Sequence, residues 1–247
     1  MSKKQIGVYG LGRFGRFWAE VLTRDFQVKA WNRTHRDISG SFSITSEDEV
    51  LSCDAVFFCV AISSFETVLR SAAPRIGNNT VVFDTCSVKS HPAHLMLTHL
   101  KKNTPCIATH PMFGPDSAAR GMEGLPMVFS PLRCEEKDST FWREYFSHLG
   151  LRVIEMTPEE HDLEAAMTQG ITHVIGRVLE DLDLKPSGIG TLGYRKILEV
   201  VEQTCNDPYQ LFLDLQHYNP HTHTMRLKLK ESLDRMMRVL EEADPYS

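Results

Sequence analysis

Two patterns of hydrophobic and polar residues divide the chain near residue 156. Before that point, short runs rich in Val, Ile and Phe alternate with longer segments in which apolar residues recur every three or four positions. The short runs predict buried strands, and the longer segments predict amphipathic helices. We expect strands at 4–10, 27–32, 55–61, 80–85, 105–110, 127–130 and 152–157, and helices at 15–26, 63–76, 91–102 and 137–150. This alternation is typical of a mostly parallel sheet with helices on both faces.

After residue 156 the pattern predicts helices alone. They are expected at 157–184, 191–205, 207–219 and 222–243. Thr157 is placed as the N-cap of the first one, with Pro158 in the first helical position and Glu160 three residues past the cap, which is the pattern of a capping box. The sequence therefore predicts an α/β fold followed by an all-helical C-terminal domain, with domains at 1–156 and 157–247.

Composition and charge narrow the class of partner. The chain has 247 residues, 42% of them hydrophobic, and a formal net charge of -5, with Lys and Arg scattered along it. Nucleic acids and anionic membranes need a basic surface, so a small-molecule partner is expected and neither of these. No apolar run approaches the length of a membrane span, and the start leads into a strand instead of a signal peptide. The six cysteines contain no C-x-x-C pair, and we expect a cytoplasmic protein.

A glycine motif lies between the first predicted strand and the first predicted helix. The segment "GLGRFG" contains Gly10, Gly12 and Gly15 in the pattern G-x-G-x-x-G. Its glycines permit a tight turn, a close approach of the backbone to a pyrophosphate, and close packing of helix on strand. The motif predicts a dinucleotide site of the Rossmann type on a doubly wound sheet, and Arg13 and Phe14 are expected beside the same cofactor.

The end of the second predicted strand bears on the choice of nicotinamide cofactor. An NAD site usually has an acidic residue there to accept hydrogen bonds from the ribose hydroxyls. This chain has Asn32, Arg33 and Thr34 instead, which offer donors and a positive charge suited to a 2′-phosphate. NADP is therefore favoured over NAD. The alternative is that Arg33 is only a solvated loop residue.

Three polar positions follow predicted strands, where ligands bind in open α/β sheets. Ser63 comes after the third strand, and Ser87 comes after the fourth. The alternative for Ser63 is an N-cap of the helix that follows it. His110 comes after the fifth, in "THPMFGP". Pro111 favours an extended His110, and an imidazole at the ligand edge can take a proton near neutral pH. The alternative for His110 is a core histidine that is satisfied by the backbone.

The helix predicted from Pro158 presents a polar ridge. Its members, four positions apart, are His161, Ala165, Gln169, His173 and Arg177. A second face contains Leu163, Met167, Val174, Val178 and Leu182. Because the middle turns of this helix have Gln, Thr and His but no Lys, we expect the ridge to line a pocket. A solvated surface is the alternative.

These segments carry a family resemblance. "GLGRFG", "VFDTCSVK", "THPMFGPDS", "EHDLEAAMTQGITHVIGRVLE" and "YNP" resemble the prephenate/arogenate dehydrogenase family of tyrosine biosynthesis, and the spacing resembles its short plant-type arogenate dehydrogenases. The resemblance covers about residues 5–219. It implies a Rossmann domain, a helical domain that completes the active site and forms a homodimer, and an oxidative decarboxylation of arogenate or prephenate.

The resemblance also implies roles for individual residues. His110 becomes the catalytic base toward the ring hydroxyl, Ser87 shares that hydroxyl, and Gln169 and His173 contact the substrate. Where microbial prephenate enzymes usually have an arginine for a substrate carboxylate, this chain has Glu202. Arg177 and Arg195 are the candidates for that role.

Asp207 matches an acidic position that accompanies arogenate preference in the plant-type group. A carboxylate there could pair with the side-chain ammonium of arogenate, which prephenate lacks. Arogenate is therefore favoured, with prephenate or both substrates as the alternative. Other readings are a β-hydroxyacid dehydrogenase, for which the ridge lacks the expected lysine, and an NADPH-binding module without turnover. His217, His221 and His223 lack a completing ligand, so no metal site is expected.

Overall fold

The computed structural model describes residues 3–34 and 39–243. The chain forms two compact units, residues 1–161 and 162–247, so the boundary between them lies inside the helix that begins at Pro158. We describe each unit by itself.

The first unit is built on one eight-stranded sheet. Its strands are β1 (Gln5–Tyr9), β2 (Gln27–Trp31), β3 (Ser43–Ile44), β4 (Ala55–Phe58), β5 (Val81–Asp84), β6 (Cys106–Pro111), β7 (Pro126–Arg133) and β8 (Arg152–Glu155). They lie in the order β3-β2-β1-β4-β5-β6-β7-β8, and every neighbouring pair is parallel except β6 with β7. This confirms the predicted doubly wound α/β fold.

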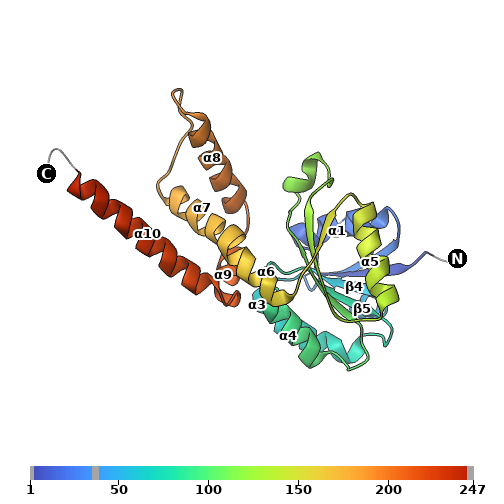
Figure 1. The fold of residues 1–247 in the computed structure, drawn as a ribbon. Coiled ribbons are helices and arrows are strands. Elements are labelled where there is room, and N and C mark those ends of the chain that lie inside the picture. Colours follow the sequence, from blue (N-terminus) through green and yellow to red (C-terminus); the bar gives the residue numbers. More distant parts are fainter. Residues whose placement is uncertain (1–2, 35–38, 244–247) are drawn as a thin grey trace. The chain divides into compact units, whose positions relative to one another are not determined.

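Helices cover both faces of this sheet (Figure 1). They are α1 (Arg13–Thr23) and α5 (Glu136–His148) on one face, and α3 (Ile62–Ala72) and α4 (Ser90–His99) on the other. Two neighbouring residues of β4 contact helices on opposite faces, because successive side chains of a strand point to opposite sides of the sheet. Phe57 packs against Trp18 of α1 and Phe146 of α5, whereas Phe58 packs against Phe65 of α3.

Three short elements of the first unit were not predicted. They are β3, α2 (Glu47–Leu51) and the 3₁₀ turn η2 (Ser117–Arg120). The helix predicted over 63–76 is formed by α3 and the 3₁₀ turn η1 (Ala73–Arg75). A capping box fixes the start of α2: the Ser46 side chain accepts a hydrogen bond from the Glu49 N–H, and the Glu49 carboxylate accepts one from the Ser46 N–H. This S-x-x-E signal is present in the sequence.

The expectation that His110 follows the fifth strand is wrong, although the range predicted for that strand, 105–110, is close to that of β6. β6 continues through Pro111, and His110 and Pro111 lie opposite Val128 and Met127 of β7. The reason is the antiparallel partner strand, which pairs with β6 beyond the point where its parallel neighbour β5 has ended. His110 is therefore held in the sheet, with the extended backbone that Pro111 favours.

The second unit is entirely helical over its described residues. After α6 (Pro158–Ala165), which starts in the first unit, come η3 (Ala166–Gly170), α7 (Ile171–Asp181), α8 (Leu192–Cys205), α9 (Tyr209–Tyr218) and α10 (Thr222–Glu242) (Figure 1). α7 packs against α8, and α10 packs against η3, α7 and α9. The contact of α7 with α8 is close, because a Cβ atom at Gly176 would lie 2.0 Å from the Thr204 hydroxyl.

The helix predicted over 157–184 starts as expected but is not continuous. The Glu160 carboxylate accepts hydrogen bonds from the N–H and hydroxyl of Thr157, and the Thr157 hydroxyl accepts one from the Glu160 N–H, which confirms the capping box. The segment η3 is a π-helix, however, with a wider turn than an α-helix. The Gln216 side-chain amide donates a hydrogen bond to the Gly170 carbonyl within it.

Within residues 3–34 and 39–243, no helix combines the length and the apolar character needed to cross a membrane.

Candidate functional site

The three glycines of the loop between β1 and α1 differ in what surrounds them. Gly10 has φ +99°, and a Cβ atom there would lie 2.5 Å from the Cys59 carbonyl oxygen. A Cβ atom at Gly15 would lie 2.0 Å from the Gly10 carbonyl oxygen. These two positions need glycine for the fold itself. Gly12 has open space, since no described atom outside its chain neighbours lies within 4 Å of a Cβ there. The loop thus fits a bound pyrophosphate at Gly12, next to the N-terminus of α1.

The other two residues of the motif have separate contacts. The Arg13 guanidinium forms an ion pair with Asp116, which follows β6 in the chain. The Phe14 ring stacks on Trp18 and packs beside Phe17, so its side chain belongs to the apolar cluster of the first unit.

The residues after β2 are also placed beside the glycine loop. The Asn32 side-chain oxygen accepts a hydrogen bond from the Leu11 N–H at 3.0 Å, and its NH₂ group donates to the Thr34 carbonyl at 2.8 Å. Asn32 thus joins the loop after β1 to the loop after β2. Arg33 and Thr34 are exposed. The Arg33 charge acts on the Tyr9 hydroxyl, whose pKa is raised mainly by burial and by its hydrogen bond to Glu47. The positive side chain of Arg33 is therefore close to the carboxyl ends of β1 and β2.

A buried ion pair joins the ends of β5 and β6. The Lys89 ammonium contacts the Asp84 carboxylate, and both side chains are 0% exposed. Lys89 also donates to the Thr109 carbonyl at 2.6 Å, and the Thr109 hydroxyl donates to the Asp84 carbonyl at 2.5 Å. These bonds fix the residue immediately before His110. The sequence analysis predicted no role for Asp84 or Lys89.

His110 lies at the carboxyl end of β6 and is 2% exposed. Its Nδ1 is 2.8 Å from Nε2 of His161 on α6. Burial lowers the pKa of His110 well below its usual range, and the charges of His161 and Lys89 lower it further. The imidazole is therefore neutral at neutral pH and able to accept a proton. His161 was predicted only as a member of the polar ridge, because its contact with His110 joins residues 51 positions apart.

The two predicted serines lie at the same edge of the sheet. Ser87 is half-buried in the loop after β5. Ser63 is exposed in the first turn of α3, after β4. The N-cap of α3 is Ala61, so Ser63 does not cap the helix. Since β1, β4, β5 and β6 are successive neighbours, His110 lies about 14 Å from the glycine loop across this edge, a span that suits an extended dinucleotide.

In the helical unit, three predicted substrate residues form one cluster. His173 is 5% exposed, and its Nε2 lies 4.0 Å from the Asp207 carboxylate. Arg177 donates hydrogen bonds to the carbonyls of Thr204 and Asp207 and pairs with Glu180. Burial, followed by the charge of Arg177, lowers the pKa of His173 to about 4. His173 is thus a neutral imidazole beside a carboxylate at neutral pH.

The ridge in this unit carries unused polar atoms. Among the described residues, Gln169 Oε1, His173 Nδ1 and Arg177 Nε are buried without a hydrogen-bond partner. Buried polar atoms normally have partners, so these three atoms are candidates for contacts with a ligand. Arg195 is not part of this cluster. It is exposed in the first turn of α8, whereas Arg177 contacts the other end of that helix, roughly 13 Å away along its axis.

The π-helical segment explains how these positions stay on one side. In a regular α-helix, positions four residues apart rotate by about 40° at each step, so Ala165 and Arg177 would differ by roughly 120°. The extra residue in the wide turn of η3 takes up about 100° of this rotation. Ala165, at the end of α6, therefore stays on the same side as His173 and Arg177 of α7.

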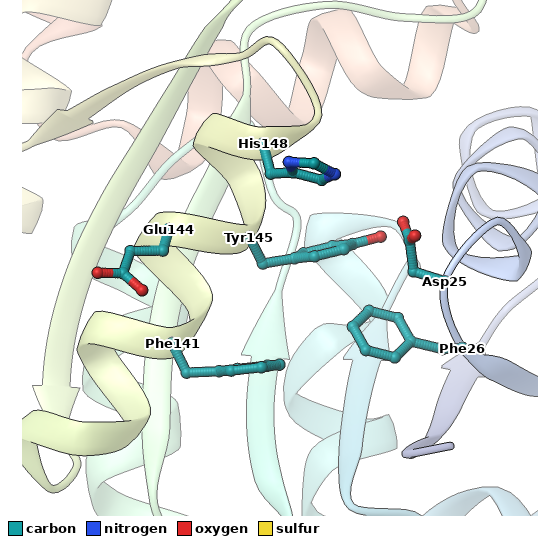
Figure 2. A pocket seen from close by; sticks show the side chains of 6 residues that line it. All are labelled: Asp25, Phe26, Phe141, Glu144, Tyr145 and His148. Carbon is teal, nitrogen blue, oxygen red and sulfur yellow. The ribbon is translucent and has the colours of Figure 1, made fainter.

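A pocket of about 270 Å³ lies elsewhere on the first unit (Figure 2). Its aromatic side chains are Phe26, Phe141 and Tyr145, and its polar ones are Asp25, Glu144 and His148. Asp25 and Phe26 directly precede β2, so the pocket is at the amino ends of the strands. The predicted ligand residues lie at the carboxyl ends, which is where such sheets bind dinucleotides.

Comparisons with known proteins agree with this geometry. Residues 20–155 match the family model of the prephenate dehydrogenase nucleotide-binding domain, and residues 178–245 match that of the TYRAAT1-like C-terminal domain. Arogenate dehydrogenase 2, chloroplastic, of Arabidopsis thaliana is 35% identical over 89% of this chain and 65% of its own length. Arogenate dehydrogenase 1, chloroplastic, of the same plant is 34% identical over 89% of this chain and 36% of its own length. The chain thus spans less than two thirds of either relative.

Solved structures share the fold. Prephenate dehydrogenase from A. aeolicus, in complex with hydroxyphenyl propionate and NAD+, aligns with a TM-score of 0.77 at 18% identity, over 100% of this chain and 94% of that one. Synechocystis arogenate dehydrogenase aligns with a TM-score of 0.69 at 18% identity, over 96% and 92%. Fold and site together define a Rossmann-type nucleotide-binding protein with a helical second unit. On the family model and the plant relatives, the chain belongs to the prephenate/arogenate dehydrogenase family.

The glycine loop gives a matched pair of variants. Gly12→Val should lower stability by no more than about 1 kcal/mol, because the side chain enters open space, yet it should abolish NADP+ binding. Gly15→Val should cost more than about 3 kcal/mol, because its Cβ meets backbone. Denaturant unfolding and calorimetric titration measure the two effects. Wild-type NADP+ affinity in Gly12→Val would contradict this assignment.

Proposed function

We propose that the protein catalyses the NADP-dependent oxidative decarboxylation of arogenate to tyrosine. One observation carries the proposal: in a chain of this family, a buried, neutral His110 lies at the same sheet edge as a glycine loop with open space at Gly12. The residues that would hold the cofactor are Gly10, Gly12 and Gly15 with the α1 N-terminus for the pyrophosphate, and Arg33 for the 2′-phosphate.

The chemistry divides between cofactor and protein. When bound, the nicotinamide supplies the acceptor for the hydride that leaves the ring carbon bearing the hydroxyl. His110 accepts the proton of that hydroxyl as the carbonyl forms, and Ser87 orients the hydroxyl by a hydrogen bond. Loss of the ring carboxylate as carbon dioxide then makes the ring aromatic, and the proton held by His110 returns to the phenol oxygen. His110 therefore ends the reaction in the neutral form in which it began.

The helical unit supplies substrate binding in this proposal. The unused polar atoms of Gln169, His173 and Arg177 support it, since they need partners that a polar substrate can provide. Asp207, beside His173, would receive the side-chain ammonium of arogenate. Arg177 offers only its Nε to a substrate carboxylate, because its other nitrogens already bond Thr204, Asp207 and Glu180. Arg195 is the second candidate for the carboxylate.

Prephenate is the alternative substrate, with 4-hydroxyphenylpyruvate as product, and a dual-specificity enzyme is the intermediate case. A more distant relative supports prephenate as the substrate: the Saccharomyces cerevisiae protein named prephenate dehydrogenase [NADP(+)] is 22% identical over 97% of this chain. That name also supports NADP as cofactor, whereas the structure in complex with NAD+ supports NAD. A non-catalytic NADPH-binding module is a further alternative.

A homodimer formed through the helical unit is part of the proposal. Four of the five apolar positions on the second face of the first helix are exposed: Leu163, Met167, Val178 and Leu182. α10 exposes a second stripe at helical spacing: Leu233, Met236, Met237 and Leu240. Exposed apolar surface of this extent is typical of a protein interface. We also propose a cytoplasmic location, which the six unpaired cysteines support, since disulfides are rare there.

A steady-state assay that crosses arogenate and prephenate with NADP+ and NAD+ tests the proposed function. We expect the highest kcat/KM for arogenate with NADP+. His110→Asn should lower kcat by about a hundredfold or more while NADP+ affinity stays nearly unchanged, because the base is lost and the nucleotide loop is intact. An unchanged kcat in this variant would remove His110 from the role. NADPH binding with no turnover of either substrate would favour the non-catalytic module.

Arg33 is expected to select NADP over NAD. Arg33→Ala should weaken NADP+ binding at least about tenfold, with little change for NAD+, because only NADP+ carries the 2′-phosphate. Arg33→Lys is the matched control, since it keeps the charge and should retain part of the preference. Titration calorimetry with both cofactors measures the ratio. Equal losses for NADP+ and NAD+ would show that Arg33 is a solvated loop residue.

Asp207 is expected to select arogenate over prephenate. Asp207→Asn should lower the arogenate-to-prephenate ratio of kcat/KM on the order of a hundredfold, since a charged hydrogen bond to the ammonium is lost. The backbone carbonyl that binds Arg177 is unaffected by this substitution. Asp181→Asn, at an exposed position of α7, is the control and should leave the ratio unchanged. An unaltered ratio in Asp207→Asn would refute this role.

A further inference from the structure

The contact between His110 and His161 determines which nitrogen of His110 can act as a base. Nδ1 of His110 and Nε2 of His161 are 2.8 Å apart, and both side chains are 2% exposed. Their rings meet at an interplanar angle of 68°. At this distance one nitrogen must donate a proton and the other must accept it. The hydrogen bond therefore couples the tautomers of the two rings.

Only one of the two neutral arrangements leaves His110 able to act as a base through Nε2. If His110 carries its proton on Nδ1, it donates to His161, and its Nε2 keeps a free lone pair. If His161 donates instead, the proton of His110 is on Nε2, which can then donate but cannot accept. We propose that His161 is a positioning residue that accepts the Nδ1 proton of His110 and thereby presents Nε2 to the substrate hydroxyl.

The placement of His161 suits this task. It lies in the first turn of α6, where its N–H donates to the Thr157 carbonyl at 3.0 Å, next to the capping box formed by Thr157 and Glu160. The Ser90 hydroxyl donates to the Pro158 carbonyl at 3.3 Å, which ties this turn to the start of α4. The backbone of His161 is thus held by bonds within the first unit, and its ring meets β6 through the contact with His110.

The electrostatic surroundings distinguish this pair from a histidine held by a carboxylate. The groups that act on His110 are His161 from α6 and Lys89 from the segment before α4, while the Asp84 carboxylate of β5 is occupied by Lys89. A neutral imidazole acceptor fixes the tautomer of His110 without adding the negative charge that would favour its protonated form. His110 consequently stays neutral, which agrees with the lowered pKa.

NMR of the ¹⁵N-labelled full chain without substrate tests the inference directly. Two-bond ¹H–¹⁵N correlations report which ring nitrogen of each histidine is protonated, and His110→Gln identifies the His110 signals. In the wild type at neutral pH we expect the proton on Nδ1 of His110. His161→Gln, whose amide oxygen can still accept, should keep that tautomer, and His161→Phe should shift His110 toward the Nε2-protonated form. His94→Gln, at an exposed position of α4, is the control.

The effect of His161 on catalysis rests on the proposed function, and it is measured separately, by the kcat of His161 variants. His161→Phe should lower kcat about a hundredfold with little change in NADP+ affinity or in the KM of the substrate, and His161→Gln should retain most of the activity. A proton on Nε2 of His110 in the wild type, or an unchanged tautomer in a folded His161→Phe, would overturn the inference. If His161→Phe does not fold, the wild-type spectrum alone decides. Because the spectra need no substrate, their result holds whether or not the protein oxidises arogenate.

Discussion

The ion pair between Lys89 and Asp84 fixes the geometry on which the proposed chemistry depends. Removing two charges from water costs several kcal/mol, and further hydrogen bonds offset part of that cost. Here Asp84 Oδ1 also accepts from the Cys86 N–H, and Lys89 donates to the Thr109 carbonyl, while Asp84 Oδ2 is buried without a hydrogen-bond partner among the described residues. These contacts lock the ends of β5 and β6 together. His110, the next residue after Thr109, therefore has a defined position before any ligand binds, which is the preorganisation that proton transfer requires.

Much of the fold could be predicted because its signals are local. Alternation of apolar runs with helical periods located seven of the eight strands, and the Thr157 capping box marked the start of α6 within one residue. The glycine loop was equally accessible, since its spacing follows from the turn it must make. α2 was missed although Ser46 and Glu49 carry a capping signal, because a helix of five residues has no periodicity to detect. β3, with two residues, is shorter still.

The site was only partly predictable, because its decisive contacts join distant residues. No spacing rule connects His110 with His161, or places an antiparallel β7 beside β6 so that the strand runs through Pro111. Arg177 illustrates a second limit. Its position on the ridge suggested a substrate carboxylate as partner, whereas two of its five N–H groups donate to the carbonyls of Thr204 and Asp207, at the turn between α8 and α9. The sequence shows the type of each side chain, but it does not show which hydrogen bonds within the fold already occupy that side chain.

The π-helical turn at Ala166–Gly170 has a consequence for how this chain can vary. Such a turn contains one residue more than an α-helical turn. It therefore changes how α7 is rotated about the helix axis relative to α6. If the same residues formed a regular α-helical turn instead, everything downstream would rotate by about 100°, which would carry His173 off the side it shares with Ala165. Loss of one residue together with the wide turn would leave that side unchanged, because the remaining residues would continue as a regular α-helix. The length of this segment and its π-helical shape are therefore linked.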